Sequence, residues 1–134
     1  MEGNDDEKYF FNFSFFQIDP KWRWMADLAK EESAKEVENV IKNSGIKFRT
    51  YSTLGLRSDA DFLFWFAAKS IEEIQSVISK LYLTVFGKYI IPTQTYVSCT
   101  RPSIYARKGR TIAFVAGNES KKYAVVYPFT KTRE

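Results

Sequence analysis

The sequence contains no histidine and only one cysteine, and both gaps restrict its chemistry. Among its 134 residues are 20 Lys and Arg, 16 Asp and Glu and no His. It therefore offers no Ser-His-Asp triad, no Cys-His pair, no imidazole base and no histidine metal ligand. The lone Cys99 excludes an internal disulfide and a cysteine-rich zinc site, and we expect it to be a buried, unreactive thiol. A single free thiol fits a reducing compartment, and we predict a cytoplasmic protein.

Long apolar runs are also missing. The longest, Asp61 to Ala68, is much shorter than the ~20 residues of a membrane-spanning helix, so we expect no membrane partner. Met1 to Lys8 is acidic, unlike a signal or transit peptide. Residues 1–7 are expected to form a short flexible tail.

Aromatic residues and an uneven charge distribution are the positive features of the composition. Aromatics reach 17%, enough to fill a core or line a pocket. Residues 1–45 hold ten acidic and six basic side chains, whereas 46–134 hold six acidic and fourteen basic ones. The basic C-terminal part suits phosphate, propionate or another anion, and an ordinary solvated face explains it equally well.

Hydrophobic periodicity predicts a β-α-β-β-α-β order. The expected strands are Tyr9–Ile18, Ile46–Gly55, Asp61–Ala68 and Thr93–Thr100. The first helix is expected to open at Asp19-Pro20 and end at Asn43–Gly45, with Trp24, Met25, Leu28, Val37, Val40 and Ile41 on its apolar face. The second is expected to open at a Ser70–Glu73 capping box and end at Gly87, with Ile71, Ile74, Val77, Ile78, Leu81 and Val85 buried. This is an α+β, ferredoxin-like fold: a four-stranded antiparallel sheet with two helices on one face, half of a dimeric α/β-barrel type of architecture.

The first strand predicts that both faces of the sheet are covered. Phe11, Phe13 and Phe15 fall on one face, and Phe10 and Phe16 fall on the other. Helices can cover only one face in this fold, so the other face would expose aromatic side chains. We expect a second sheet, from another domain or another subunit, to pack there.

A short internal similarity bears on domain organisation. Lys8–Phe15 resembles Lys122–Phe129, since both begin Lys-Tyr and continue as apolar strand-like sequence. Such similarity indicates duplication, with chance as the rival explanation. The expected division is a tail at 1–7, a ferredoxin-like domain at 8–103, a connector at 104–121 and the truncated first strand of a second such domain at 122–134.

Three segments resemble the chlorite dismutase family, which includes the coproheme decarboxylases: Tyr51–Arg57, Asp59–Trp65 and Tyr123–Glu134. The most specific is the Tyr-Pro-x-x-Lys-x-Arg motif, which begins at Tyr127. The resemblance implies two ferredoxin-like domains per family member, association into rings (commonly pentamers), and heme or coproheme held by a proximal His in the C-terminal domain. This chain corresponds to the N-terminal domain plus the connector. We therefore expect no tight heme binding by this chain alone.

The resemblance also implies two site residues. In the decarboxylase branch, the tyrosine of the motif forms a radical near a porphyrin propionate and the lysine lies near the propionates. These roles fall on Tyr127 and Lys131, and a phenol and an ammonium group suit them chemically. Phe129-Thr130 replaces the Met-Ser of that branch, which leaves the subfamily open, and Arg133 matches the motif without an assigned role. Without the resemblance, Tyr127 would be read as a core tyrosine and Lys131 as a solvated charge.

Two other function classes compete with this interpretation. One is a non-catalytic ferredoxin-like oligomerisation module that self-associates through its sheet face. The other is RNA binding, because RNA-recognition domains share the β-α-β-β-α-β order. Asp61–Phe66 lacks the Lys/Arg-Gly start of the RNA-binding pattern on the third strand, so we expect no nucleic-acid partner.

Overall fold

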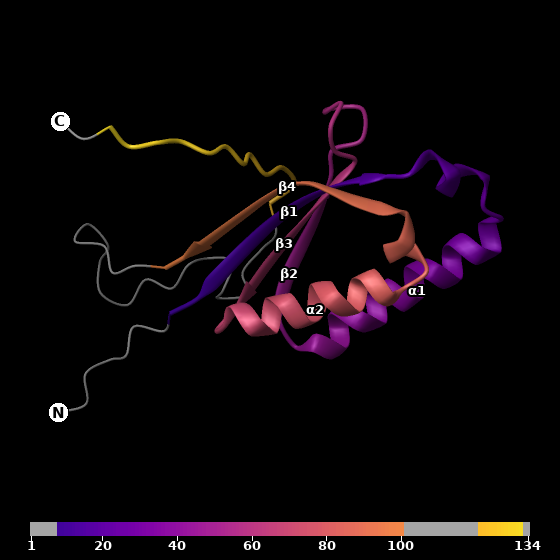
Figure 1. The fold of residues 1–134 in the computed structure, drawn as a ribbon, viewed down its shortest axis with the longest axis horizontal. Coiled ribbons are helices and arrows are strands. Elements are labelled where there is room, and N and C mark those ends of the chain that lie inside the picture. The colour runs from indigo at the N-terminus through magenta and orange to yellow at the C-terminus, as the bar shows by residue number, and fades with distance from the viewer. Residues whose placement is uncertain (1–7, 101–120, 133–134) are drawn as a thin grey trace.

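In the computed structural model of the chain, residues 8–100 and 121–132 are described, and they contain one sheet and two α-helices (Figure 1). The elements in chain order are β1 (Phe10–Ile18), η1 (Pro20–Trp24), α1 (Asp27–Ser44), β2 (Lys47–Ser52), β3 (Phe62–Ala68), α2 (Ile71–Leu83), η2 (Phe86–Tyr89) and β4 (Ile90–Cys99). The predicted β-α-β-β-α-β order is confirmed. Within the described ranges no helix is both long and apolar enough to cross a bilayer.

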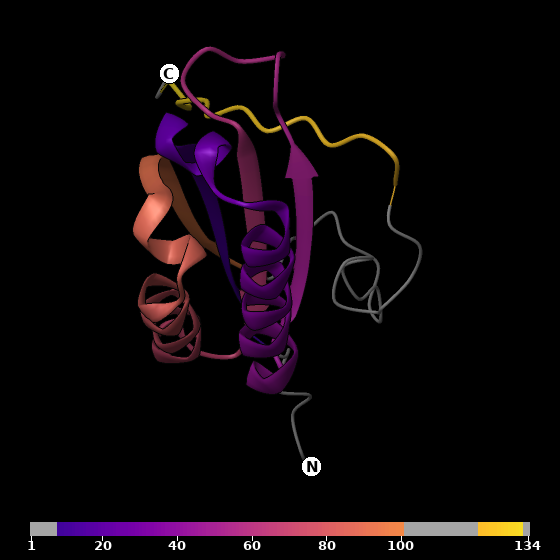
Figure 2. The ribbon, with the colours of Figure 1, turned by 90° about the vertical axis from the view of Figure 1, so that its right-hand side faces the viewer.

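The sheet has the ferredoxin-like strand order β2-β3-β1-β4, and every neighbouring pair is antiparallel. β1 is central, as its apolar residues on both faces predict: Phe13 lies opposite Trp65 of β3 and Tyr96 of β4. Both helices cover one face of this sheet (Figure 2).

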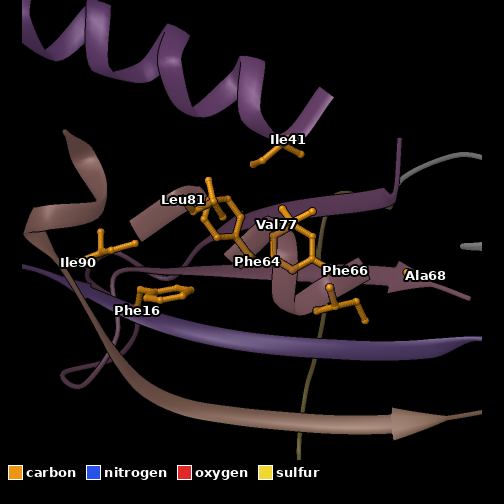
Figure 3. Close-up of a cluster of buried hydrophobic side chains, with 9 residues drawn as sticks. Phe16, Ile41, Phe64, Phe66, Ala68, Val77, Leu81 and Ile90 are labelled. Carbon is orange, nitrogen blue, oxygen red and sulfur yellow. The ribbon is translucent and has the colours of Figure 1, made fainter. Parts of the chain in front are cut away.

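The main core lies between the sheet and the helices (Figure 3). Phe16 and Phe66, from β1 and β3, are the largest fully buried side chains. Ile41 of α1 and Val77 and Leu81 of α2 pack against them. Each fully buried side chain of this size contributes about 1.5–3 kcal/mol, so this layer is the main source of stability.

The first helix begins later than predicted. Asp19 and Pro20 do open a helix, and the Asp19 carboxylate accepts from the Lys21 N–H at 2.9 Å, but that helix is the short 3₁₀ element η1. Ala26 is extended (φ −61°, ψ 143°), and α1 starts only at Asp27. The Trp22 ring, 5.0 Å from Phe86 and 5.4 Å from Tyr89, anchors η1 to η2, so a tertiary contact overrides the helical periodicity.

The apolar stripes of both helices are narrower than predicted. On the first predicted helix, Trp24 and Leu28 are 88% and 68% exposed, because they lie at the break that separates η1 from α1. On α2, Ile74, Val77 and Leu81 are buried as expected, whereas Ile71 and Val85 near its two ends are exposed.

The end of α2 also differs from the prediction. The Ser70–Glu73 capping box is present as predicted, but the helix ends at Leu83, before Gly87. The Thr84 hydroxyl donates to the Leu81 carbonyl at 2.6 Å and accepts from the Gly87 N–H at 2.9 Å. Gly87 is buried here, and a Cβ at this position would lie 2.0 Å from the Leu81 carbonyl oxygen. Gly87 is therefore required by a close backbone approach in η2 and does not terminate the helix.

Residues 121–132 contain no helix or strand. They lie across the side of the sheet that α1 and α2 leave open, as the yellow trace shows (Figures 1 and 2). The two similar stretches therefore differ in structure. Lys8–Phe15 lies largely in the central strand β1, whereas Lys122–Phe129 pairs with no strand. That residues 122–134 begin a second domain stays a prediction, as do the other domain boundaries. The tail at 1–7, most of the connector, the basic residues Arg107, Lys108 and Arg110, and Arg133 lie outside the described residues.

Candidate functional site

The sheet face opposite the helices is lined with aromatic side chains. Phe11 and Phe15 of β1 and Leu63 of β3 are buried there, although no helix covers them. Phe13 and Trp65 stack with ring centroids 5.0 Å apart and an interplanar angle of 27°. Both rings are half-buried. This face is thus a partly exposed apolar surface, of the kind that marks an interaction site.

The C-terminal segment 121–132 lies over this aromatic face and borders an open cavity of about 610 Å³. Val126 packs on the cluster of Phe15, Ala60 and Leu63. The Tyr51 hydroxyl donates to the Lys121 carbonyl at 3.5 Å. The cavity is lined from the sheet by Phe13, Arg49, Tyr51, Trp65, Tyr96 and Ser98, and from the segment by Lys121 and residues 123–129. Its volume is in the range of small-molecule sites.

The two predicted site residues both lie on this segment. Tyr127 lines the cavity, yet 71% of its surface is exposed, and its ring centroid is 6.2 Å from that of Phe129. It is thus no core tyrosine in this structure. Lys131 is exposed and lies outside the cavity lining. The two side chains are therefore exposed on one segment, four residues apart in the sequence.

A charged pair next to β3 fixes the loop at one edge of the face. Arg57 donates to both carboxylate oxygens of Asp59, at 2.7 and 2.8 Å, and its guanidinium lies 5.6 Å from the centre of the Phe15 ring. The hydrogen bonds from Arg57 are the main cause that holds the pKa of Asp59 below its usual value, and the positive charge of Arg57 is a smaller one. Gln94 of β4 also donates to Asp59, at 3.4 Å. Both charged residues belong to the segments that carry the family resemblance, and Asp59 joins the β2–β3 loop to β4.

Sequence reasoning missed several residues of the cavity. Arg49 lies 5.8 Å from the Trp65 ring in cation–π geometry, and Tyr51 and Tyr96 form two of the walls. The alternation of Arg49 and Tyr51 within β2 could have placed them on one face. Cys99, expected to be buried, is only half-buried at the end of β4.

The kinds of side chain present determine which part of a heme these residues could contact. The sequence has no His, and the described residues contain no cluster of His, Cys, Asp or Glu that could hold a metal ion. The sequence therefore offers no histidine as a ligand for iron, and the described residues offer no carboxylate cluster. The exposed phenol of Tyr127 and the exposed ammonium of Lys131 instead fit carboxylate groups at the edge of a porphyrin.

Comparison with known proteins identifies the family. The sequence profile described as Chlorite dismutase matches residues 30–134. A curated relative, the coproheme decarboxylase of Mycolicibacterium smegmatis, is 38% identical over 85 residues, which are 63% of this chain and 36% of the relative. The chain thus spans little more than a third of that protein.

Solved structures agree in fold. The chlorite dismutase of Candidatus Nitrospira defluvii, solved in complex with imidazole, has a TM-score of 0.70 at 21% identity, covering 72% of this chain and 42% of that one. Its R173E mutant gives a TM-score of 0.69 over the same shares. A heme-binding protein from Thermus thermophilus gives a TM-score of 0.57 at 14% identity, covering 69% of this chain and 40% of that one. At such identities these structures support the fold, and the profile match over most of the chain shows that this protein belongs to the chlorite dismutase family.

Proposed function

We propose that this chain contributes the carboxylate-facing side of a porphyrin site in a heme-dependent oxidoreductase of the coproheme decarboxylase type. The observation that carries the proposal is that the segment 121–132 exposes Tyr127 and Lys131. The 38% identity to a coproheme decarboxylase supports the choice of substrate class. The porphyrin itself, heme or coproheme, would be held by residues outside this chain, which supplies no histidine.

Tyr127 is the proposed redox residue. Oxidative loss of CO₂ from a propionate releases two electrons and one proton, so the reaction needs a two-electron oxidant, for which we name a peroxide. Bound heme would supply the oxidising centre. The Tyr127 phenol can give up one electron and its hydroxyl proton and later recover both, which Phe cannot do. Because the side chain is 71% exposed, its hydroxyl can approach a ligand that covers the segment.

Lys131 is the proposed carboxylate partner. Its ammonium is a compact cation on a flexible stem, which suits a propionate with some freedom of position. An exposed ion pair in water contributes about 0.2–1 kcal/mol, and more once a bound porphyrin excludes solvent. We therefore assign Lys131 to orienting the substrate and Tyr127 to the redox step.

The test joins this chain to the remaining part of the Mycolicibacterium smegmatis coproheme decarboxylase and follows coproheme conversion with peroxide. Tyr127→Phe should lower conversion by at least about 100-fold, the low end of what loss of a proton-transfer group costs. Lys131→Met should weaken porphyrin binding more than turnover. Tyr123→Phe is the matched control, because Tyr123 is a 77% exposed tyrosine of the same segment. Full conversion by the Tyr127→Phe protein would refute the proposed role.

The assembly and location of the protein extend the same proposal. The family resemblance implies a homo-oligomeric ring, commonly a pentamer, in which this chain is one part of each subunit. A cytoplasmic location would keep the single thiol, Cys99, reduced. Sedimentation of the joined protein with porphyrin would give the subunit number.

A second candidate is a non-catalytic module that self-associates through its sheet face. The observation that favours it is the half-exposed stack of Phe13 on Trp65, which a second apolar sheet would cover. In this case Tyr127→Phe would change no activity, whereas substitutions on the sheet face would change the oligomeric state.

A further inference from the structure

Within the described range 121–132, burial is confined to one residue next to Tyr127. Val126 is half-buried, whereas its neighbours Val125 and Tyr127 are 84% and 71% exposed. Val126 is also the only residue of the described range 121–132 that is not exposed. Two adjacent valines of the same size and hydrophobicity therefore have opposite environments.

The contact of Val126 explains the difference. Its side chain packs on a cluster whose buried members are Phe15 of β1, Ala60, and Leu63 of β3. With the segment in place these three are 5%, 1% and 2% exposed, so Val126 packs on side chains that are almost fully covered. Burial of its methyl groups there is favourable, and the contact is made near the start of β3, beside the loop that precedes it.

Val126 packs on the sheet, while Tyr127 next to it lines the cavity and keeps 71% of its surface exposed. A shift of the segment by one residue would bring Val125 or Tyr127 onto the cluster in place of Val126. The hydrogen bond from the Tyr51 hydroxyl to the Lys121 carbonyl adds a second attachment, five residues before Val126.

We propose that Val126 is a positioning residue, which docks the segment on the Phe15–Ala60–Leu63 cluster and thereby holds Tyr127 at the cavity with its side chain open to a bound porphyrin. The inference rests on the proposed function for the role of Tyr127, but the docking itself involves only residues of this chain. Val126 touches no substrate, and it acts only through the orientation of its neighbour. Tyr51 has the same kind of role at the start of the segment.

The docking is tested by NMR on the chain itself. The Val126 methyl groups should show nuclear Overhauser contacts with the Leu63 methyls and the Phe15 ring, and the Val125 methyls should show none. A soluble gadolinium chelate should broaden the ring signals of Tyr127 and spare the methyls of Val126. Contacts from Val125 instead of Val126 would overturn the proposal.

Matched variants separate positioning from general packing. Val126→Ala should abolish the Overhauser contacts between the segment and the sheet and move the ¹⁹F signal of 3-fluorotyrosine at position 127 to its value in an unfolded chain. Val125→Ala should leave that signal in place, and Val126→Ile should restore it. Equal shifts in the two alanine variants would overturn the proposal. Docking that holds while Tyr127→Phe remains active would instead reject the proposed function, so the two failures are distinguishable.

Discussion

Gly87 shows how one residue without a side chain can fix a chain reversal. A Cβ built there lies 2.0 Å from the Leu81 carbonyl oxygen and 2.8 Å from the Tyr82 Cα, both backbone atoms that cannot turn aside. Gly87→Ala should therefore lower the free energy of unfolding by about 3 kcal/mol, the upper range for overpacking. Gly45→Ala is the control: φ is +72° there but nothing lies within 4 Å, so about 1 kcal/mol is expected from the left-handed backbone alone. Urea denaturation of both variants measures the difference, and equal losses would contradict the steric explanation.

The Arg57–Asp59 pair gives a pH-dependent prediction at the same scale. The hydrogen bonds from Arg57 lower the pKa of Asp59 in the folded chain, so the pair stabilises the fold above the usual aspartate pKa. That contribution is lost as the pH falls through the lowered pKa. Arg57→Gln should raise the pKa of Asp59 toward its ordinary value, as measured by the carboxyl ¹³C shift. Arg23→Gln removes the same charge from exposed η1 and should leave the titration unchanged; a matching shift there would implicate net charge instead.

Individual residues differ in how far the sequence predicts them. The opposite faces of Phe11 and Phe10 follow from strand alternation, which is a local property, and the structure agrees. The function of Gly87 depends on how closely two turns approach after folding, and no local pattern encodes that distance. Val126 has the same limitation, because its environment is set by strands more than sixty residues away in the chain.

At the scale of elements, α2 illustrates a start signal that works locally. The Ser70 hydroxyl accepts from the Glu73 N–H at 3.2 Å, and the Glu73 carboxylate accepts from the Ser70 N–H at 3.1 Å. Ser70→Ala should lower the free energy of unfolding by about 1 kcal/mol, because it removes the side-chain acceptor for an orphan helix N–H. Ser79→Ala is the matched control, since Ser79 donates only to the Gln75 carbonyl within the helix. Thermal unfolding followed by circular dichroism compares them, and a larger loss for Ser79→Ala would contradict the capping explanation.

The first predicted helix shows a limit of predicting helices and strands from the sequence. Its opening residues, Asp19 and Pro20, are ordinary helix-start signals, and they do begin a helix. What they cannot specify is the break at Ala26, which follows from the packing of Trp22 on η2, some sixty residues later. The candidate site has the same character. Arg49, Tyr51 and Tyr96 come from two edge strands, and they meet over the sheet only because the register with β3 and β1 places them there.

At the scale of the whole molecule, the proposed division of heme contacts between this chain and another part of the protein predicts how the isolated chain responds to heme. Under the proposed function, the chain would present Tyr127 and Lys131 to the carboxylate side of a porphyrin, and its sequence has no histidine for the iron. Titration of the purified chain with heme should therefore give no sharp, stoichiometric Soret change. The joined protein described above is the positive control. Stoichiometric binding with peroxide or chlorite turnover by the chain alone would contradict the assignment of the iron ligand to another part.

The aromatic face of the sheet determines how the isolated chain should behave in solution. Val126 covers only part of this face, and the Phe13–Trp65 stack stays half-exposed beside it. Under either proposed function a second apolar surface belongs on this stack, so the chain alone should self-associate, and light scattering should give a mass well above 15.6 kDa. Trp65→Ser should shift the equilibrium toward monomer, because it removes the largest ring from the contact. Trp24→Ser is the matched control: Trp24 is 88% exposed but lies on η1, away from the sheet face, so the mass should not change. Circular dichroism must show the same fold in both variants, and a wild-type monomer, or equal effects of the two substitutions, would mean that the sheet face is not the contact surface.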